Sequence, residues 1–513
     1  MKKKLSPYLP GILLFTVCLL ISLFTFKDYG VAWDEQAQEQ IGTICYNYIQ
    51  GTDSTFKTYF NKEYGVAFEL PLIALEKNLK LTDSRKITLV RHFSTHFFFL
   101  FAALCGYVLF YRLFRSRFIA CTGFLMLVCN PRLYAHSFFN TKDIPLLCAV
   151  LICFTIAQIA FDKNKTLWYL LLGIACAYAT AIRLTAIILP LAFTCFFIID
   201  IVTGIVKKKK PLFTFLNFVL FALTFCGVLY VSWPALWGHP FHNFAAAYET
   251  FSHFKKWDYG VLFMGDMPIA SMLPWYYIPV WFLISTPELW ILAALAGTIW
   301  ILLSFAKKPL DYISNTPARN FLLYGACFYM PVIAVLKLHS IVYDDWRHLY
   351  FIYPAFILLA LFAINKLMQT RSRRIVQLLC VAQLTVVSIF MFRNHPFQQL
   401  YFNNLVSHKE EHLRKNFEMD YWGCSFKQGL DYILAHDTRP KIKIASPFHS
   451  VVENNIGLLP LNDRERFMIV DDKDLPDYFI TNFRGHPGDY DYPGILFNIK
   501  VLNNSVLRVY KCH

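Results

Sequence analysis

Charged and polar side chains gather in four short segments of an otherwise apolar sequence. The segments are 31–35, 130–145, 181–185 and 343–348. The candidate residues that they carry are Asp34 and Glu35; His136, Asn140, Lys142 and Asp143; Arg183; and Tyr343, Asp344, Asp345, Arg347 and His348. Ionisable residues at membrane depth are costly to desolvate, so those that persist beside apolar spans indicate a functional site.

The residue types in these segments suit one kind of reaction. A carboxylate can take the proton of an attacking hydroxyl, and a phosphate that leaves needs cations around it. Arginine in particular binds phosphate through a fork of N–H donors. Acids from different loops, together with arginine, lysine and histidine beside a membrane groove, therefore favour transfer from a lipid-linked phosphate to a hydroxyl.

Each segment also has a structural explanation. The adjacent acids at 34–35 are consistent with the solvated start of a helix, because acidic residues favour helix N-termini. Asp143 with Pro145 is consistent with a capped helix start, although this does not explain the polar residues just before it. Arg183 alone is consistent with a cation that extends from an apolar helix into water, and 343–348 with a polar loop that carries aromatic side chains.

Composition places the chain in a membrane. Of its 513 residues 56% are hydrophobic and 16% are charged, whereas a soluble protein has about 25% charged residues. The net charge of +15 comes largely from short basic clusters between apolar runs, where orientation signals occur. This pattern excludes a nucleic-acid partner and predicts contact with membrane lipids. The sequence lacks CxxC and Cys/His metal spacing.

The apolar runs predict about eleven spanning helices. They lie at 8–26, 93–111, 118–131, 144–161, 167–182, 184–205, 212–232, 276–305, 321–337, 349–367 and 375–392. The first run follows Lys2, Lys3 and Lys4 and is too long for a signal peptide, so we interpret it as an uncleaved span. The run at 276–305 is interrupted by Thr286-Pro287 and is either one kinked helix or a half-buried helix followed by a span.

Basic clusters fall in every second loop, which orients the chain. The inside clusters are Arg112, Arg115 and Arg117; Lys163 and Lys165; Lys207–Lys210; Lys307 and Lys308; and Arg371, Arg373 and Arg374. With the N-terminus inside, all four polar segments lie on the outer face, and 130–145 is a short outside loop. The polar stretches 233–275 and 338–348 are outside as well.

The predicted fold is an all-α polytopic membrane bundle with a small α/β domain. Residues 1–392 form the membrane module, whose first extracytoplasmic loop is 27–90, and residues 393–513 form an extracytoplasmic domain. In that domain the sequence predicts a helix at 425–436, strands at 441–445, 467–470 and 478–481, and a hairpin of 496–502 with 506–510.

Several motifs resemble the GT-C glycosyltransferases, in particular family 39, which includes protein O-mannosyltransferases and the bacterial aminoarabinose transferase of lipid A. The acidic pair Asp34-Glu35 after the first span is similar to the acidic motif of that family, as is a second acid in a later short loop, at Asp143. Further similar stretches are 273–277 with 286–287, 347–351, 395–398 and 401–403. The last two stretches look like those of bacterial, uncharacterised members of this group, and the resemblance covers about residues 1–405.

The resemblance implies an inverting transfer of a hexosyl or pentosyl group from a polyprenyl-phosphate donor at the outer face of a bacterial inner membrane. It implies Asp34 as general base, beside Glu35, and Asp143 as a residue that positions a substrate. Arg183, Arg347, His348 and Lys142 would bind the donor phosphate. His136, Asn140, Tyr343, Asp344 and Asp345 would line the substrate site. The acceptor is a glycan, a lipid or a protein, and family members differ in whether they need a divalent metal.

The sequence departs from the family pattern in two respects, and two other functions are open. The His-Pro-Pro-type motif of many family members is absent, with 64–69 in its place, and no MIR-type insertion is evident. A transporter or flippase of a lipid-linked or anionic substrate is the main alternative, although the polar groups gather at the outer mouth and the chain lacks internal repeats. A membrane anchor for the C-terminal domain is the other, although eleven spans exceed what an anchor needs.

Overall fold

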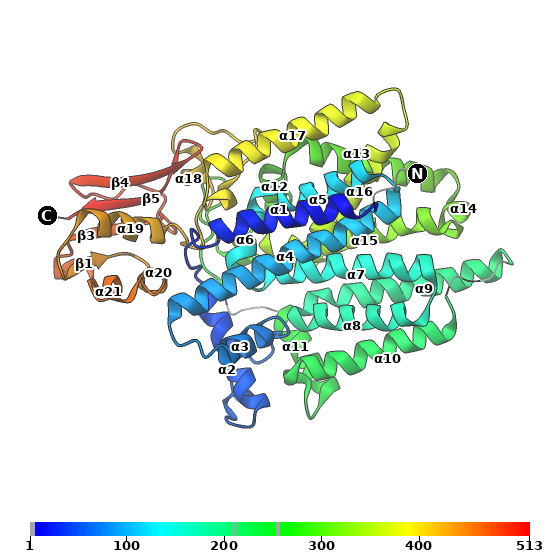
Figure 1. Cartoon of the computed structure of the whole chain (residues 1–513), viewed down its shortest axis with the longest axis horizontal. Coiled ribbons are helices and arrows are strands. Elements are labelled where there is room, and N and C mark those ends of the chain that lie inside the picture. The colour runs from blue at the N-terminus through cyan, green and yellow to red at the C-terminus, as the bar shows by residue number, and fades with distance from the viewer. Residues whose placement is uncertain (1–5, 209–210, 212, 253–256, 513) are drawn as a thin grey trace.

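The computed structural model describes residues 6–208, 211, 213–252 and 257–512. Figure 1 shows a bundle of long helices with a small sheet domain against one end, which we call the domain end. The described part of the chain begins at the opposite end of the bundle. The basic residues Lys2, Lys3, Lys4, Lys209 and Lys210, which entered the prediction of orientation, lie outside the described residues.

Eight helices in the described ranges are long and apolar enough to cross a membrane, or nine if one bent pair is a single span. The eight are α4 (Ser84–Phe114), α7 (Asp143–Lys163), η2 with α9 (Leu184–Ile187 and Ile188–Val206), α10 (Phe215–Ser232), α13 (Glu288–Lys307), α15 (Thr316–Lys337), η5 with α16 (Arg347–Ile352 and Tyr353–Met368) and α17 (Arg373–Arg393). Two apolar helices, α1 (Leu9–Thr25) and α8 (Thr166–Ile182), are shorter. The polytopic bundle is confirmed, and the count of eleven spans stays a prediction.

The bent pair is α5 (Arg117–Val128) and α6 (Pro131–Phe139), whose axes differ by 59°. Asn130 caps α6 by accepting a hydrogen bond from the backbone N–H of Leu133 at 3.1 Å, and Pro131 cannot continue the hydrogen bonds of α5. All nine residues of α6 are buried. The prediction of a short loop at 130–145 is therefore wrong, because a buried helix occupies most of this segment.

The run predicted at 276–305 forms two helices, α12 (Tyr277–Ser285) and α13, which was the second of its two predicted forms. Pro287 precedes α13, and the side chain of Asn403 donates to the carbonyl oxygen of Thr286 at 2.7 Å. A side chain from beyond the last span thus satisfies a backbone acceptor that the end of a helix leaves free.

The loops predicted on the inside meet at the end of the bundle opposite the sheet domain. Arg112 pairs with Asp162 at 2.7 Å, and Lys207 pairs with Asp311 at 3.1 Å. Asp311 belongs to α14 (Pro309–Ser314), which lies at this end in Figure 1. The basic clusters between spans are therefore gathered at one end, as the alternation of charges predicts.

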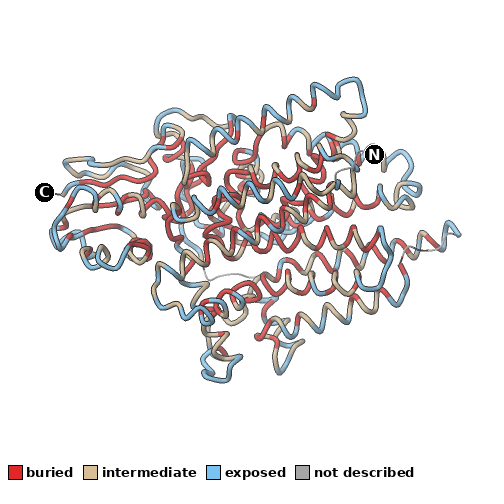
Figure 2. The backbone as a smooth tube through the Cα atoms, viewed as in Figure 1, coloured by how far each residue is buried: buried red, intermediate tan, exposed pale blue. Residues whose placement is uncertain are grey.

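Shorter elements cover the domain end of the bundle. They are α2 (Glu35–Ile49), η1 (Thr55–Lys57), α3 (Glu69–Asn78), η3 (Pro234–Leu236), α11 (Pro240–Ser252), η4 (Ala270–Met272) and η6 (Gln398–Leu400). Figure 2 shows buried residues concentrated in the middle of the bundle and at its contact with the domain. Among the spans, α7 and α16 have the largest buried shares, and α10 and α17 the smallest.

The C-terminal domain has a five-stranded mixed sheet in the order β2-β1-β3-β5-β4. Its elements are α18 (His412–Asn416), α19 (Phe426–His436), β1 (Ile442–Ala445), α20 (His449–Ile456), α21 (Leu461–Arg464), β2 (Phe467–Ile469), η7 (Asp472–Asp474), β3 (Tyr478–Thr481), β4 (Gly494–Val501) and β5 (Asn504–Lys511). β1 pairs in parallel with β2 and β3, whereas β5 is antiparallel to β3 and β4. The predicted helix, strands and hairpin are present, and the domain boundary at 392–393 stays a prediction.

The domain is joined to the segment that precedes α2. The side chain of Asn455 accepts a hydrogen bond from the backbone N–H of Val31 at 2.9 Å and donates one to the carbonyl oxygen of Val31 at 3.0 Å. The backbone N–H of Trp33 donates to the carbonyl oxygen of Trp422 at 3.0 Å. A Cβ atom on Gly30 would lie 2.0 Å from the carbonyl oxygen of Cys424, so only glycine permits this approach. The segment that carries Asp34 is thus positioned by the C-terminal domain.

Candidate active site at the domain end

The guanidinium of Arg347 is the centre of the candidate site. Arg347 is the first residue of η5 and is buried. Its Nη2 lies 3.3 Å from Oδ2 of Asp344, and its Nη1 lies 3.4 Å from Oδ2 of Asp143 and 3.7 Å from Oδ2 of Asp34. Residues 34, 143 and 344–347, from three of the four polar segments, therefore meet around one cation, and we call this group the Arg347 cluster.

The fourth segment joins the cluster through Asp143. Arg183, the residue after α8, forms an ion pair with Oδ1 of Asp143. Asn140 donates to Oδ2 of the same carboxylate at 3.1 Å and accepts from the backbone N–H of Asp143 at 2.8 Å. Asp143 is the first residue of α7 rather than its N-cap, so the capping explanation is wrong. Its carboxylate is fully engaged in orienting two arginines.

Asp34 is the accessible acid of the cluster. It precedes α2 and its side chain does not cap that helix. Of its side chain 42% is exposed, whereas the side chain of Asp143 is only 2% exposed. The surrounding protein desolvates the carboxylate and raises the pKa of Asp34, against the opposing effect of Arg347. An accessible carboxylate with a raised pKa is a stronger base than an ordinary aspartate.

Lys142 adds an unpaired cation. Its Nζ is buried without a hydrogen-bond partner among the described residues, and it lies 3.6 Å from the ring centroid of Tyr64. Burial and the neighbouring Arg183 lower the pKa of Lys142 to about 7. A buried ammonium group that makes no hydrogen bond is costly, and an anionic ligand between Lys142 and the arginines would satisfy it.

Tyr343 and His348 flank Arg347. The guanidinium of Arg347 lies 4.8 Å from the ring centroid of Tyr343, which also stacks on Trp257 at 3.9 Å. His348 packs edge-on against Tyr343 at 4.7 Å and is half-buried. Asp344 and Asp345 have φ angles of 55° and 63°, a left-handed conformation that aspartate tolerates better than most residues. Because of this turn, Asp344 contacts the Arg347 cluster, whereas Asp345 belongs to a second network of hydrogen bonds.

The second network is entirely buried. Asp345 pairs with Arg132 at 2.9 Å and accepts from the hydroxyls of Tyr350 at 2.9 Å and Tyr421 at 2.7 Å. The hydroxyl of Tyr421 lies 3.3 Å from Nε2 of His136. His136 is 0% exposed and Asp345 is 1% exposed. The structure therefore places these two predicted substrate-binding residues in the support of the site and not on its surface.

Glu35 is not brought into the cluster. Its carboxylate accepts from the backbone N–H of Ala32 at 2.6 Å and lies 3.0 Å from Nε2 of His92 on α4. Consecutive residues of a helix do not face the same direction, and the carboxylate of Glu35 faces α4 whereas that of Asp34 faces Arg347. The structure assigns Glu35 a contact with α4, whereas the sequence grouped it with the catalytic acids.

Arg484 is a site residue that the sequence analysis missed. It follows β3 in the C-terminal domain, its Nη2 lies 3.0 Å from Oδ1 of Asp344, and it also donates to the carbonyl oxygen of Tyr421. Its guanidinium lies 5.7 Å from the ring centroid of Trp33. Burial raises the pKa of the nearby Glu418 to about 8. The only signal in the sequence was a lone arginine at the end of a predicted strand.

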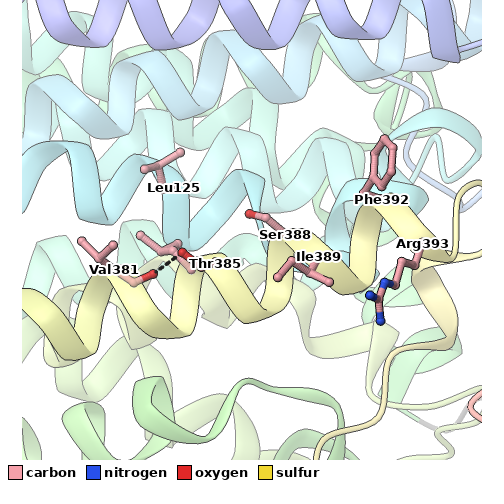
Figure 3. Close-up of a pocket in the computed structure, with 8 residues that line it drawn as sticks. Leu125, Val381, Thr385, Ser388, Ile389, Phe392 and Arg393 are labelled. Atoms are coloured by element: carbon pink, nitrogen blue, oxygen red, sulfur yellow. Dashed lines mark hydrogen bonds between the residues drawn. The ribbon is translucent and has the colours of Figure 1, made fainter.

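Two further observations delimit the site. In the described part of the chain, no group of three or more His, Cys, Asp or Glu side chains could bind a metal ion. An apolar groove of about 660 Å³ between α5 and α17 is lined by Leu125, Val381, Leu384, Thr385, Ser388, Ile389, Phe392 and Arg393 (Figure 3). None of these residues belongs to the Arg347 cluster.

A family model matches part of the chain. The family model for dolichyl-phosphate-mannose-protein mannosyltransferases matches residues 83–230, a segment that includes Asp143 and Arg183 but neither Asp34 nor Arg347. A search of curated protein sequences finds no match.

Solved structures match over most of the chain. The apo oligosaccharyltransferase of Archaeoglobus fulgidus has a TM-score of 0.51 and 8% identity, covering 92% of this chain and 70% of that one. The archaeal oligosaccharyltransferase AglB from the same organism, in complex with an inhibitory peptide and a dolichol-phosphate, has a TM-score of 0.50 and 9% identity, covering 92% and 69%. Apo ArnT from Cupriavidus metallidurans has a TM-score of 0.49 and 12% identity, covering 97% of both chains. The fold predicted from the sequence is confirmed: the chain has a GT-C-like bundle of membrane helices with a small C-terminal sheet domain.

Proposed function

We propose that this protein transfers a glycosyl group from a polyprenyl-phosphate donor to an acceptor hydroxyl, with inversion at the anomeric carbon. The observation that carries the proposal is the accessible carboxylate of Asp34 3.7 Å from the guanidinium of Arg347, with the Lys142 ammonium close by. Such a pairing of base and phosphate site is what displacement of a lipid phosphate by a hydroxyl requires.

In the proposed reaction Asp34 takes the proton of the acceptor hydroxyl as its oxygen forms a bond to the anomeric carbon. The bond between that carbon and the phosphate oxygen breaks, and the phosphate leaves with the electron pair. Lys142, Arg183 and Arg347 stabilise the negative charge that develops on the phosphate. A preorganised set of cations lowers the barrier because it does not need to reorganise during the reaction.

Asp143 takes a positioning role in this proposal. Its carboxylate already contacts Arg183, Arg347 and Asn140, so it is not available as a base. It fixes the directions of both guanidinium groups. Tyr343 and His348 form a wall beside Arg347 against which the donor sugar or phosphate would lie.

We infer that the domain end faces the extracytoplasmic side of a bacterial plasma membrane. Basic loops favour the cytoplasmic side, and the pairs Arg112–Asp162 and Lys207–Asp311 lie at the opposite end of the bundle. The donor and acceptor would then meet outside the cell, or in the periplasm.

The test uses the purified full chain in lipid nanodiscs with radiolabelled undecaprenyl-phosphate sugars and total cell-envelope extract as the source of acceptor. We expect label to move from the lipid donor to a product, and Asp34→Asn to lower the rate at least about 100-fold, since general base catalysis contributes that much or more. Asp53→Asn, an exposed aspartate of the same loop, is the control and should react normally. Full activity of Asp34→Asn would remove Asp34 from the role of base. In a parallel assay with proteoliposomes, label that crosses the membrane without forming product would favour a transporter.

A further inference from the structure

A second cleft, separate from the Arg347 cluster, opens between α2, the start of α4 and the end of α20. Its volume is about 400 Å³, within the range of ligand sites. Gln36, Glu39, Gln40 and Thr43 line it from α2. These positions recur at helical spacing, so α2 presents one continuous polar face to the cleft.

One of the side chains that line the cleft is a buried charged group. Arg91 is 2% exposed and pairs with Glu69 and with Glu76, the latter at 2.7 Å. Its Nε is buried without a hydrogen-bond partner among the described residues. Buried polar atoms are normally satisfied, so this donor is available to a ligand atom or to an ordered water.

The lining excludes several classes of ligand. Most of the side chains that line it are polar, and the apolar ones among the described residues are Val31, Ile44 and Ile87. A lipid chain or an apolar peptide side chain would therefore leave polar groups without hydrogen-bond partners. Glu35 and Glu39 line the cleft, and Arg91 is already paired with two other carboxylates. The local charge is therefore negative and disfavours phosphates and other anions.

The remaining class is a neutral molecule with many hydroxyl groups. Amide side chains both donate and accept hydrogen bonds, hydroxyls do the same, and carboxylates accept. Gln36, Gln40, Thr43 and Glu39 together present these groups within about two turns of one helix. Glu39 is desolvated by burial, which raises its pKa, and a hydrogen bond that a desolvated carboxylate accepts is stronger than one in open water.

The cleft and the reacting centre share the first turn of α2. Glu35 lines the cleft while Asp34, the adjacent residue, belongs to the Arg347 cluster, and consecutive Cα atoms are about 3.8 Å apart. We propose that the cleft binds a non-reacting sugar unit of a carbohydrate acceptor, whose reacting hydroxyl lies at Asp34. This inference rests on the proposed function and narrows the acceptor from glycan, lipid or protein to a glycan of two or more units.

Binding of soluble trisaccharides tests the cleft independently of catalysis. The probes are cellotriose, chitotriose, maltotriose and mannotriose, with triglycine as the peptide probe, in saturation-transfer NMR on the full chain in nanodiscs. We expect transfer to at least one trisaccharide and none to triglycine. Asp34→Asn should keep this binding, so a failure of the base assignment and a failure of the cleft assignment are distinguishable.

Matched variants on α2 locate the binding. Gln40→Trp fills the cleft, whereas Gln50→Trp adds the same bulk to an exposed residue just beyond the helix, outside the lining. Gln40→Trp should abolish transfer, Glu39→Gln should weaken binding about ten-fold by loss of a charge-assisted hydrogen bond, and Gln50→Trp should bind as the native protein does. The inference is overturned if no trisaccharide binds, if triglycine competes for the site, or if Gln40→Trp binds normally.

Discussion

Nη2 of Arg484 lies 3.0 Å from Oδ1 of Asp344, and the other oxygen of that carboxylate lies 3.3 Å from Nη2 of Arg347. Asp344 thus links an arginine of the C-terminal domain to the arginine at the centre of the Arg347 cluster. The domain is therefore part of the site and not only a neighbour of it, because it restrains both Asp344 and the segment that carries Asp34.

This link predicts that Arg484 affects catalysis from the C-terminal domain. We expect Arg484→Ala to lower kcat/KM for an undecaprenyl-phosphate sugar by about 10- to 100-fold, the effect of losing a charge-assisted hydrogen bond that orients Arg347. Arg484→Lys should recover part of the rate. Arg439→Ala removes an exposed arginine of the same domain that pairs with Asp437 and Asp477, and it should leave the rate unchanged. Equal rates for all three variants and the native protein would show that the domain does not restrain the site.

The pKa of Asp34 predicts the acid limb of the rate profile. Because burial raises this pKa, kcat/KM should fall with decreasing pH while the pH is still above the usual range of an aspartate, as the base becomes protonated. kcat/KM is measured between about pH 4 and pH 8 at constant ionic strength. This range begins at about the pKa of an ordinary carboxyl group and extends above it. An acid limb at the usual aspartate pKa would contradict the desolvated environment.

The same raised pKa predicts an effect of Asp34 on stability. The folded state binds a proton more tightly than the unfolded state, so Asp34 destabilises the fold increasingly as the pH rises from its unfolded pKa through its folded pKa. Asp34→Asn removes that charge and should raise the Tm of the detergent-solubilised protein at pH 7 while it lowers activity. A lower Tm together with lower activity would indicate damage to the fold instead of loss of the base.

Much of the fold followed from patterns that the chain carries locally. The apolar runs predicted most of the long helices within a few residues, although α4 begins at Ser84 and not at 93. Alternation with turn residues predicted β3 and the hairpin of β4 with β5. The segment 130–145 was misjudged because α6 is only nine residues long and its polar side chains, Arg132 and His136 among them, are buried. The polar residues therefore do not mark a solvent-facing side of a helix. Short buried helices take their conformation from tertiary packing.

Residues that the structure brings together around Arg347 were singled out where charge itself was the signal, as at Asp34, Asp143 and Arg183. The sequence could not distinguish the contacts of Asp34 from those of Glu35, because the direction in which each side chain points depends on the residue at which the helix starts. It could not separate Asp344 from Asp345 either, because two successive left-handed residues send the side chains into different networks. Arg484 lies 140 residues beyond Asp344, and only the docking of the domain brings them together.

Lys142 predicts a pH dependence of donor binding. Its pKa of about 7 means that its charge is present below this pH and is lost above it, so the affinity for undecaprenyl phosphate should weaken as the pH rises from 6 to 8.5, on either side of that pKa. Bound phosphate favours the ammonium form and moves the decline to somewhat higher pH. Lys142→Arg stays charged and should flatten the dependence, whereas Lys62→Arg, at a half-buried lysine that donates to a backbone carbonyl, should leave it unchanged. Microscale thermophoresis in nanodiscs gives the Kd, and a flat native profile would contradict a phosphate contact at Lys142.

The buried pair of Arg132 and Asp345 stabilises the fold, so we expect a substitution in it to lower the Tm and to leave the affinity for the donor unchanged. The two side chains are 1% and 0% exposed, so Arg132→Met leaves the carboxylate of Asp345 buried with only the hydroxyls of Tyr350 and Tyr421 to satisfy it. Breaking such a pair from one side costs about 3–5 kcal/mol. We expect a large drop in Tm for Arg132→Met and partial recovery in the double variant Arg132→Met with Asp345→Asn, which removes the stranded charge. The remaining folded protein should bind the donor with an unchanged Kd, because neither residue reaches the surface of the site. A changed Kd with a native Tm would return Asp345 to the substrate-binding role that its sequence suggested.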